Sequence, residues 1–393
     1  MLEEVYELLE KDFENTVKMR RHLHEHPELS FEEEETPKLI ARFLKEIGVE
    51  VREGVGGRGV VGVIRGGKPG KTIALRADFD ALPIQDLKEV PYRSKVPGKM
   101  HACGHDAHTA TLLSVAKALQ EKKDALNGNV VLIHQFAEEL VPGGAQAMIK
   151  DGCLDGVDAI FGTHLWSTIP VGQAAFQPQA IMAAADHFDV KIIGRGGHGG
   201  LPHETIDPIV IGTNWVQMIQ QIISRGVSPL DSAVISVGAI HGGDAFNIIP
   251  GELSIRGTVR TLRTDVQQMI ERKMEALLRT LCEGTGATYV YQYIKGYPPV
   301  VNHADETNFV QACAEEVLGV SSCFVTEPLM VGEDFSYYLQ QVPGTFFLTG
   351  AGNSEKNVVY PHHHPMFDID EQAMLHAGKI LASAAWKFLN EKA

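Results

Sequence analysis

The sequence predicts an α/β fold: a mostly parallel sheet, with a ferredoxin-like α+β domain inserted into the chain. Two observations lead to this prediction. Short apolar runs rich in β-branched residues alternate with helix-like stretches in the first part of the chain. The middle of the chain follows a different order, β-α-β-β-α-β, which is the ferredoxin-like pattern.

Three apolar runs in the first part predict strands at residues 72–83, 129–139 and 157–164, with helix-like stretches at 109–122 and 144–151. Strands that alternate with helices form largely parallel sheets, and ligands collect beyond the carboxyl ends of such strands. Charged or metal-competent side chains occupy these predicted ends: Asp78, Asp80, Glu138, Glu139 and His164. We therefore expect a functional site at this edge of the sheet.

The middle of the chain predicts six elements of one inserted domain. Strands are expected at 186–195, 232–239, 252–260 and 287–294, and helices at 207–225 and 265–283. This places the inserted domain at residues 184–297. Residues 1–183 and 298–393 then form one discontinuous domain that bears the metal-competent strand ends.

Composition narrows the possible partners and compartments. The 393 residues carry a formal charge of −15, which disfavours binding to nucleic acid or to an anionic membrane. Five scattered cysteines do not suggest a disulfide framework, so we expect a reducing compartment. Residues 2–21 have helical spacing rather than a signal-peptide pattern, and no apolar run is long enough to cross a bilayer. These features predict a cytoplasmic protein.

The stretch "MHACGHDAHTA" at residues 100–110 concentrates metal-competent side chains. With residues from the other strand ends, the candidate ligands are Cys103, His105, Glu139, His164 and one of His362, His363 or His364. A site that combines thiolate, imidazole and carboxylate suits zinc or a neighbouring first-row ion. Two such ions close together would polarise a carbonyl and activate water. The pattern thus predicts a dinuclear hydrolytic centre.

The pair Glu138–Glu139 follows the predicted strand at 129–139. Adjacent residues of a strand point in opposite directions, but a bend at the strand end can turn both side chains toward one pocket. One carboxylate would then bind metal while its neighbour transfers a proton.

Nine motifs in order resemble one known family, the aminoacylase/hippurate hydrolase branch of the carboxypeptidase G-like dinuclear metallopeptidases. They extend from Arg20 to Glu371 and include "RRHLHEHPELSFEE", "LRADFDALP", "MHACGHDAHTA", "GTHLW", "GRGGHGGLPH", "RGTVRT", "GEDFS" and "HHHPMFDIDE". The resemblance implies a metal-dependent enzyme that hydrolyses N-acyl-L-amino acids to a carboxylate and a free amino acid. An N-acetyl-diaminopimelate deacetylase, or a carboxypeptidase or dipeptidase acting on small peptides, is the alternative.

The resemblance also implies residue roles. It makes Cys103, His105, Glu139, His164 and His363 the ligands of two divalent metals, zinc first, with cobalt, manganese or nickel as alternatives. Glu138 corresponds to the general base, and Asp80 to the aspartate that supports the centre from behind. The carboxypeptidase branch has histidine at the position of Asp78 and aspartate at that of His105, so the bridging ligand stays open. A metal-storage protein of this fold would have no need of Glu138.

In the inserted domain, the resemblance gives a role to three residues. His198 would reach the scissile carbonyl of a neighbouring subunit, while Asn247 and Arg260 would hold the substrate carboxylate. The inserted domain would then serve for dimerisation and as a lid, and the protein would be a homodimer or a dimer of dimers.

Other polar residues have simpler expected roles. His101 and His108 are expected to make structural hydrogen bonds, and His22, His24 and His26 to pack or to support the site from outside. Asp334 is expected to cap a helix that begins at this point. The pair Arg20–Arg21 is expected at a helix end.

Overall fold

The computed structural model describes residues 1–391, which divide into two compact units. The first unit contains Met1–Ile181, Val301–Glu327 and the chain from Asp334 onward. The second contains Met182–Val300 and Pro328–Glu333, so the chain returns briefly to it late in the sequence. The sequence does not indicate this return, and the expected division at 184–297 stays a prediction.

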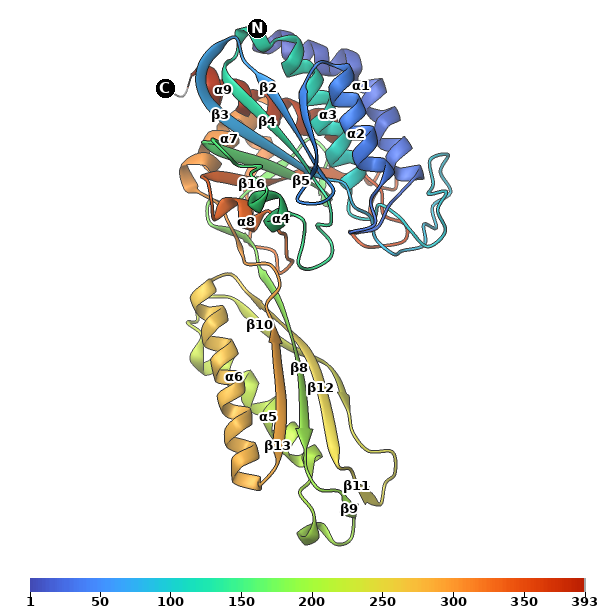
Figure 1. The fold of residues 1–393 in the computed structure, drawn as a ribbon, viewed down its shortest axis with the longest axis vertical. Helices are drawn as coiled ribbons and strands as arrows, with labels where there is room; N and C mark the ends of the chain where they lie inside the picture. The colour runs from blue at the N-terminus through green and yellow to red at the C-terminus, as the bar shows by residue number, and fades with distance from the viewer. Residues whose placement is uncertain (392–393) are drawn as a thin grey trace. The chain divides into compact units, whose positions relative to one another are not determined.

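The first unit is built on an eight-stranded sheet with the order β1-β2-β4-β3-β5-β16-β6-β15 (Figure 1). Its strands are β1 (Glu50–Val55), β2 (Gly59–Arg65), β3 (Lys68–Asp78), β4 (Asn127–Gln135), β5 (Ala159–Pro170), β6 (Ala174–Phe176), β15 (Cys323–Val325) and β16 (Gly344–Gly352). The central pairs β4–β3, β3–β5 and β5–β16 are parallel, as is β6–β15, whereas β1–β2, β2–β4 and β16–β6 are antiparallel. The predicted α/β class with a mostly parallel sheet is confirmed.

Helices cover this sheet and fix the strands that carry the site. They are α1 (Leu2–Glu25), α2 (Glu35–Glu46), α3 (His105–Glu121), α4 (Ala145–Lys150), α7 (Ala304–Leu318), α8 (Ser336–Leu339) and α9 (Gln372–Asn390). Helices α3 and α9 pack on β3 and on each other, and α1 packs against both of them. Helix α3 is buried along nearly its whole length, so its first residue, His105, is held rigidly beside the end of β3.

The end of β3 determines the surroundings of His164. Strand β3 pairs with β5 only as far as Gly162, whereas β16 continues to pair with β5 as far as Pro170. His164 therefore lies inside β5, and its expected position at a strand end is wrong. On the side of β3, however, the backbone of β5 after Gly162 has no strand partner, so its peptide groups can bind side chains.

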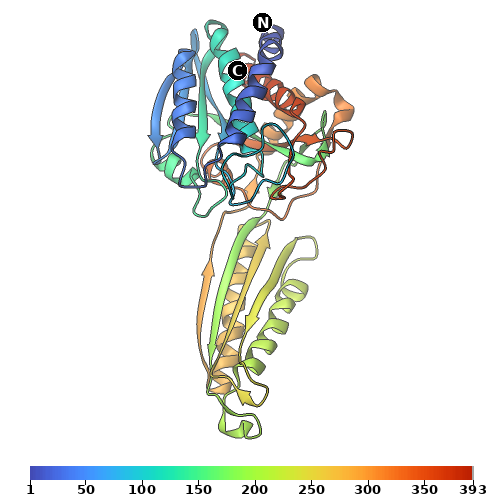
Figure 2. The same cartoon turned by 90° about the vertical axis from the view of Figure 1, so that its right-hand side faces the viewer.

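The second unit is a four-stranded antiparallel sheet with the order β10-β12-β8-β13. Helices α5 and α6 lie together on one face of it (Figure 2). Its elements are β8 (Ala184–Ile193), β9 (Gly197–His198), α5 (Pro208–Gln221), β10 (Ala233–His241), β11 (Ile248–Ile249), β12 (Glu252–Thr261), α6 (Thr264–Thr285) and β13 (Thr288–Ile294). This confirms the predicted ferredoxin-like fold.

Local chemistry explains where the helices of this unit begin and end. Asp207 accepts hydrogen bonds from the backbone N–H groups of Ile209 and Val210, and Pro208 occupies the first position of α5. Gly286, at φ 77°, ends α6 in the left-handed conformation. No helix within residues 1–391 is long and apolar enough to span a bilayer.

Candidate metal centre

The expected ligands come from four segments that meet at the carboxyl end of the central sheet. Cys103 and His105 lie at the start of α3, Glu139 follows β4, His164 belongs to β5, and His363 precedes α9. Gly104 has φ 94°, a conformation that glycine adopts readily, and it allows the chain to turn sharply between Cys103 and His105.

Among several groups of ligand atoms in this region, two contain Cys103. Cys103, His105 and His164 form the first, with Cys103 Sγ 3.4 Å from His164 Nε2. Cys103, Glu139 and His363 form the second, with Glu139 Oε1 3.2 Å from His363 Nε2. The thiol of Cys103 belongs to both groups.

Unpartnered buried atoms show that these residues suit a cation. Within residues 1–391, His105 Nε2 and Glu139 Oε1 are buried and have no hydrogen-bond partner, and the contact of Glu139 Oε1 with His363 Nε2 is an ion-pair contact only. Buried polar atoms are rarely left in this state, because each costs free energy unless a hydrogen bond or an ion satisfies it. A divalent cation would satisfy both atoms, and the mixture of sulfur, nitrogen and oxygen donors is the one that zinc and its neighbours accept.

Hydrogen bonds behind the imidazoles turn their lone pairs toward these groups. His105 Nδ1–H donates to Asp80 Oδ1 at 3.1 Å, and His164 Nδ1–H donates to the carbonyl oxygen of Leu165 at 3.0 Å. Each ring then carries its hydrogen on Nδ1 and presents the Nε2 lone pair to the cluster.

The peptide of Leu165 also orients two further histidines. Its N–H donates to His108 Nε2 at 2.9 Å, and its carbonyl accepts from His362 Nε2 at 3.1 Å. His108 Nδ1 then donates to Asp78 Oδ1 at 2.6 Å. The N–H and carbonyl of Leu165 can bind these side chains because β3 has ended. Within residues 1–391, Leu165 therefore has no strand partner on the side of β3.

The three consecutive histidines have different surroundings. His362 donates a hydrogen bond to the carbonyl of Leu165 and packs against Trp166, with ring centroids 4.3 Å apart and ring planes tilted by 33°. His364 accepts a hydrogen bond from the N–H of Met366 and stacks on the ring of Tyr360. Only His363 joins a group of ligand atoms. Its φ of 64° is unusual for a residue other than glycine, and such strain is concentrated at functional sites.

Glu138 and Glu139 both face the cluster. Glu138 Oε2 lies 3.9 Å and Glu139 Oε1 3.7 Å from His105 Nε2. Ala137, directly before them, has φ 51°, so the chain turns sharply as it enters this pair. Glu139 also joins Cys103 and His363, whereas Glu138 does not.

Charge accumulates around His105. Burial disfavours the charged form of its ring, but the charges of Asp78, Asp80 and Glu139 outweigh burial and raise the pKa of His105 to about 10. Burial, with the charges of Glu139 and Glu138, raises the pKa of the Cys103 thiol well above its usual value. Both shifts reflect an excess of negative charge around this site, which a bound divalent cation would relieve.

Asp78 is engaged elsewhere, which bears on the open question of the bridge. Its Oδ2 lies 2.6 Å from Arg76 Nη1, and its Oδ1 accepts from His108. Both oxygens of Asp78 therefore have strong partners within the first unit, although Oδ2 is also 3.7 Å from His105 Nε2.

Two expectations for residues around the centre are wrong. Asp334 does not cap its own helix: it accepts from the N–H of Ala145 at the start of α4 and from Gln135, and it pairs with Arg76. His101 makes no structural hydrogen bond, because neither ring nitrogen has a partner within residues 1–391.

Arg20 is the main residue that sequence reasoning missed. Helix α1 continues to Glu25, so Arg20 is not at a helix end, and its side chain is fully buried. It pairs with Asp106 at 2.8 Å, and His24 donates to the same carboxylate at 2.7 Å. Asp106 directly follows His105, so this buried network holds the first turn of α3. His22 and His26 are instead exposed, and their rings pack against each other at a tilt of 40° at the end of α1.

The three expected substrate-binding residues belong to the second unit. His198 and Asn247 are exposed and lie together: β9 pairs with β11, and the N–H of Gly199 donates to the Asn247 carbonyl. Arg260 lies toward the other end of β12, where Nη1 contacts the carbonyl oxygens of Asp186 and Val259. From Glu252 to Arg260 a strand spans roughly 26 Å. One chain therefore does not bring Asn247 and Arg260 together.

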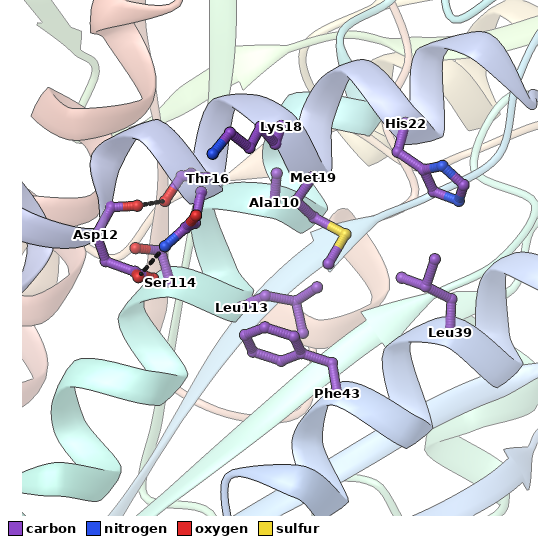
Figure 3. A pocket seen from close by; sticks show the side chains of 11 residues that line it. Asp12, Thr16, Lys18, Met19, His22, Leu39, Phe43, Ala110, Leu113 and Ser114 are labelled. Carbon is purple, nitrogen blue, oxygen red and sulfur yellow. Dashed lines mark hydrogen bonds between the residues drawn. The ribbon is translucent and has the colours of Figure 1, made fainter.

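A separate hollow lies between α1, α2 and α3 (Figure 3). Its wall is mostly apolar, with Met19, Leu39, Phe43 and Leu113, and Asp12 and Lys18 lie at its side. None of the predicted site residues lines it.

Comparison with known proteins places this geometry in context. The model of Peptidase family M20/M25/M40 matches residues 74–387. The Bacillus subtilis protein YhaA, named provisionally as an amidohydrolase, is 53% identical over 382 residues, covering 97% of this chain and 96% of its own. Thermostable carboxypeptidase 1 of Saccharolobus solfataricus is 42% identical, covering 95% of each chain. N-acetyl-L-cysteine deacetylase of Bacillus subtilis is 40% identical, and the match covers 95% of this chain and 88% of that protein.

A solved structure agrees over both units. The Bacillus subtilis YXEP protein, described as a dinuclear metal binding peptidase, superposes with a TM-score of 0.82 at 34% identity. The match covers 97% of this chain and 99% of that one.

Proposed function

Because this chain belongs to Peptidase family M20/M25/M40, we propose that it hydrolyses the amide bond of N-acyl-L-amino acids, releasing a carboxylate and a free amino acid. Membership confirms the resemblance drawn from the sequence, and the chain is a metal-binding hydrolase of amide bonds. The observation that carries the proposal is the placement of Glu138 beside two linked groups of ligand atoms. The name of N-acetyl-L-cysteine deacetylase supports an N-acyl amino acid as the substrate.

Five residues are proposed to hold two divalent metals: Cys103, His105, Glu139, His164 and His363. Zinc is the first candidate, and cobalt, manganese or nickel are alternatives. When bound, such ions polarise a carbonyl group and activate water. Asp80 would support the centre by fixing the His105 ring.

Glu138 is proposed as the general base. Its carboxylate would accept a proton from the attacking water and then donate it to the leaving nitrogen, as the C–O bond forms and the C–N bond breaks. His198 would donate to the oxygen of the scissile carbonyl as negative charge develops there. Arg260 and Asn247 would hold the substrate carboxylate.

The separation of these groups supports a composite site. His198 and Asn247 lie together, whereas Arg260 lies at the other end of β12, so one chain does not supply all three to one substrate. We propose that the protein works as a homodimer, alone or as a dimer of dimers, in which His198 and Asn247 act on the substrate of the partner subunit.

The five free cysteines support a reducing compartment, so we propose a cytoplasmic location. The relative named as a carboxypeptidase favours a second candidate function, cleavage of small peptides.

A panel of substrates separates the two functions. Turnover would be measured with N-acetyl, N-benzoyl and N-indoleacetyl amino acids, N-acetyl-diaminopimelate and dipeptides, with and without a chelator. Hydrolysis of the N-acyl amino acids that is lost on chelation and restored by metal supports the proposal. Turnover of peptides alone would favour the second candidate, and chelator-resistant turnover would contradict both.

Subunit mixing tests the composite site. Inactive His198→Ala and Glu138→Ala proteins would be mixed under conditions of subunit exchange. Each mixed dimer would contain one site with both Glu138 and His198 intact, so about one quarter of the wild-type activity should return. Verified mixed dimers without activity would show that His198 does not act across subunits.

A further inference from the structure

The backbone before the glutamate pair adopts an unfavourable conformation. Ala137 is fully buried and has φ 51°, in the left-handed region that side chains with a Cβ disfavour. In an extended strand, Glu138 and Glu139 would point in opposite directions. Here both carboxylates lie within 4 Å of His105 Nε2. The left-handed turn at Ala137 sets the direction in which the chain enters this pair, so something must hold the turn in place.

Glu33 is the side chain that holds it. This residue lies outside the cluster of ligands and is fully buried. Its Oε1 accepts a hydrogen bond from the N–H of Ala137 at 2.8 Å, and its Oε2 has no hydrogen-bond partner within residues 1–391. Arg58 in turn donates to the backbone carbonyl of Glu33 and fixes its position. Burial, with the charge of Asp80, raises the pKa of Glu33 to about 8, so the group is a neutral acid at pH 7.

Neighbours of Glu33 support the same turn. The ring of Phe31 meets Phe136 edge-on, with centroids 5.9 Å apart. Ser30 Oγ donates to Asp80 Oδ2 at 2.7 Å, and that same oxygen accepts the N–H of Glu139 at 3.0 Å. Segment 30–33 thus contacts Phe136, before Ala137, directly and is linked to Glu139, after Ala137, through Asp80.

We infer that Glu33 is a positioning residue, whose carboxyl group fixes the left-handed turn at Ala137 and thereby aims Glu138 and Glu139 at one centre. The effect on turnover rests on the function proposed above, whereas the effect on metal binding rests only on the aim of Glu139. The carboxyl group of Glu33 acts through the backbone and touches neither metal nor substrate.

Three variants test the inference, with metal affinity measured by competition with a chelator and kcat measured separately. Glu33→Gln keeps a carbonyl acceptor and should stay within about twofold of wild type. Glu33→Met removes the acceptor, so nothing offsets the cost of the left-handed conformation at Ala137. Metal affinity and kcat should then both fall about tenfold or more. Adding Ala137→Gly should recover most of the loss, because glycine adopts this conformation readily.

Glu28→Met is the matched control. Glu28 lies in the same region and accepts the N–H groups of Glu35 and Thr36 at the start of α2. Its replacement should lower the melting temperature without changing metal affinity. If Glu33→Met does not fold, Glu33→Asp, shorter by one methylene group, replaces it with the same expectations.

Unchanged metal affinity in the Met or Asp variant, or no recovery with Ala137→Gly, would overturn the inference. A wild-type protein that binds metal but hydrolyses no panel substrate would instead contradict the proposed function, and the affinity series would still decide the role of Glu33.

Discussion

Replacing Asp80 by asparagine tests how the centre is held from behind. Asp80 Oδ1 accepts the Nδ1–H of His105, and Oδ2 accepts from both Ser30 and the N–H of Glu139. Asparagine offers one oxygen and one NH2 group. Either the His105 ring or the pair formed by Ser30 and the N–H of Glu139 must therefore face a donor where it now faces an acceptor. If the NH2 group faces His105, the ring must move its hydrogen to Nε2, and the lone pair that the cluster needs is lost.

If the NH2 group faces the other side, the buried N–H of Glu139 loses its acceptor, at a cost of about 1–3 kcal/mol. Either orientation should weaken metal binding about 10- to 100-fold, the usual effect of removing a partner behind a metal ligand. Zinc affinity would be measured by competition with a chelator, and the fold of the metal-free variant by thermal unfolding.

Asp186→Asn is the matched control for Asp80→Asn. Asp186 is also a buried carboxylate, and it accepts from Gln267, Tyr293 and the N–H of Gly296 in the second unit. This control should lower stability and leave zinc affinity unchanged. An Asp80→Asn protein that binds zinc within about twofold of wild type would refute the reasoning about the His105 ring.

Three further outcomes are expected. Glu138→Gln should retain metal and lose about 10²- to 10⁴-fold in kcat, as expected for a general base, whereas Glu139→Gln should lose metal. Metal content and turnover would be measured for both variants, and the reverse pattern would exchange the two roles. Burial and the charges of Glu139 and Glu138 raise the pKa of the Cys103 thiol. Its alkylation in metal-free protein should therefore be slow near pH 7 and accelerate as the pH rises, and fast labelling at neutral pH would contradict this. Burial lowers the pKa of His134 to about 3, below the unfolded value of 6.5, so its contribution to stability is fully present above about pH 6.5 and is lost as the pH falls toward 3. His134→Leu should remove this loss, about 3 kcal/mol between pH 7 and 4.5 in denaturant titrations, and equal acid sensitivity of both proteins would count against it.

The inserted domain was predictable because its signals are local. The helix expected at 207–225 is observed as Pro208–Gln221 with a further turn over Ile222–Gly226, and the cap at Asp207 and the apolar spacing are both visible in the sequence. The place of strand β16 in the sheet is not predictable, because nothing near it in the sequence shows that it lies between β5 and β6.

The same distinction applies to the site. The ligand candidates are predictable because Cys103 and His105 are close in sequence, within a stretch that concentrates metal-competent side chains. The burial of Arg20 is not predictable in this way, because its partners, Asp106 and Asp368, are 86 and 348 residues away along the chain. The same holds for Asp334, which accepts the N–H of Ala145 at the start of α4, a helix far from it in the sequence.

The peptide of Leu165 has a consequence for how this centre tolerates change. The groups that orient His108, His164 and His362 are one N–H and one carbonyl oxygen of the main chain. No side-chain substitution at this position removes them, except proline, which lacks the N–H. Position 165 would therefore vary among apolar residues like any buried site, and surveys of invariant residues would overlook it. The ring orientations of three histidines would thus pass unchanged through mutation of the residue that sets them.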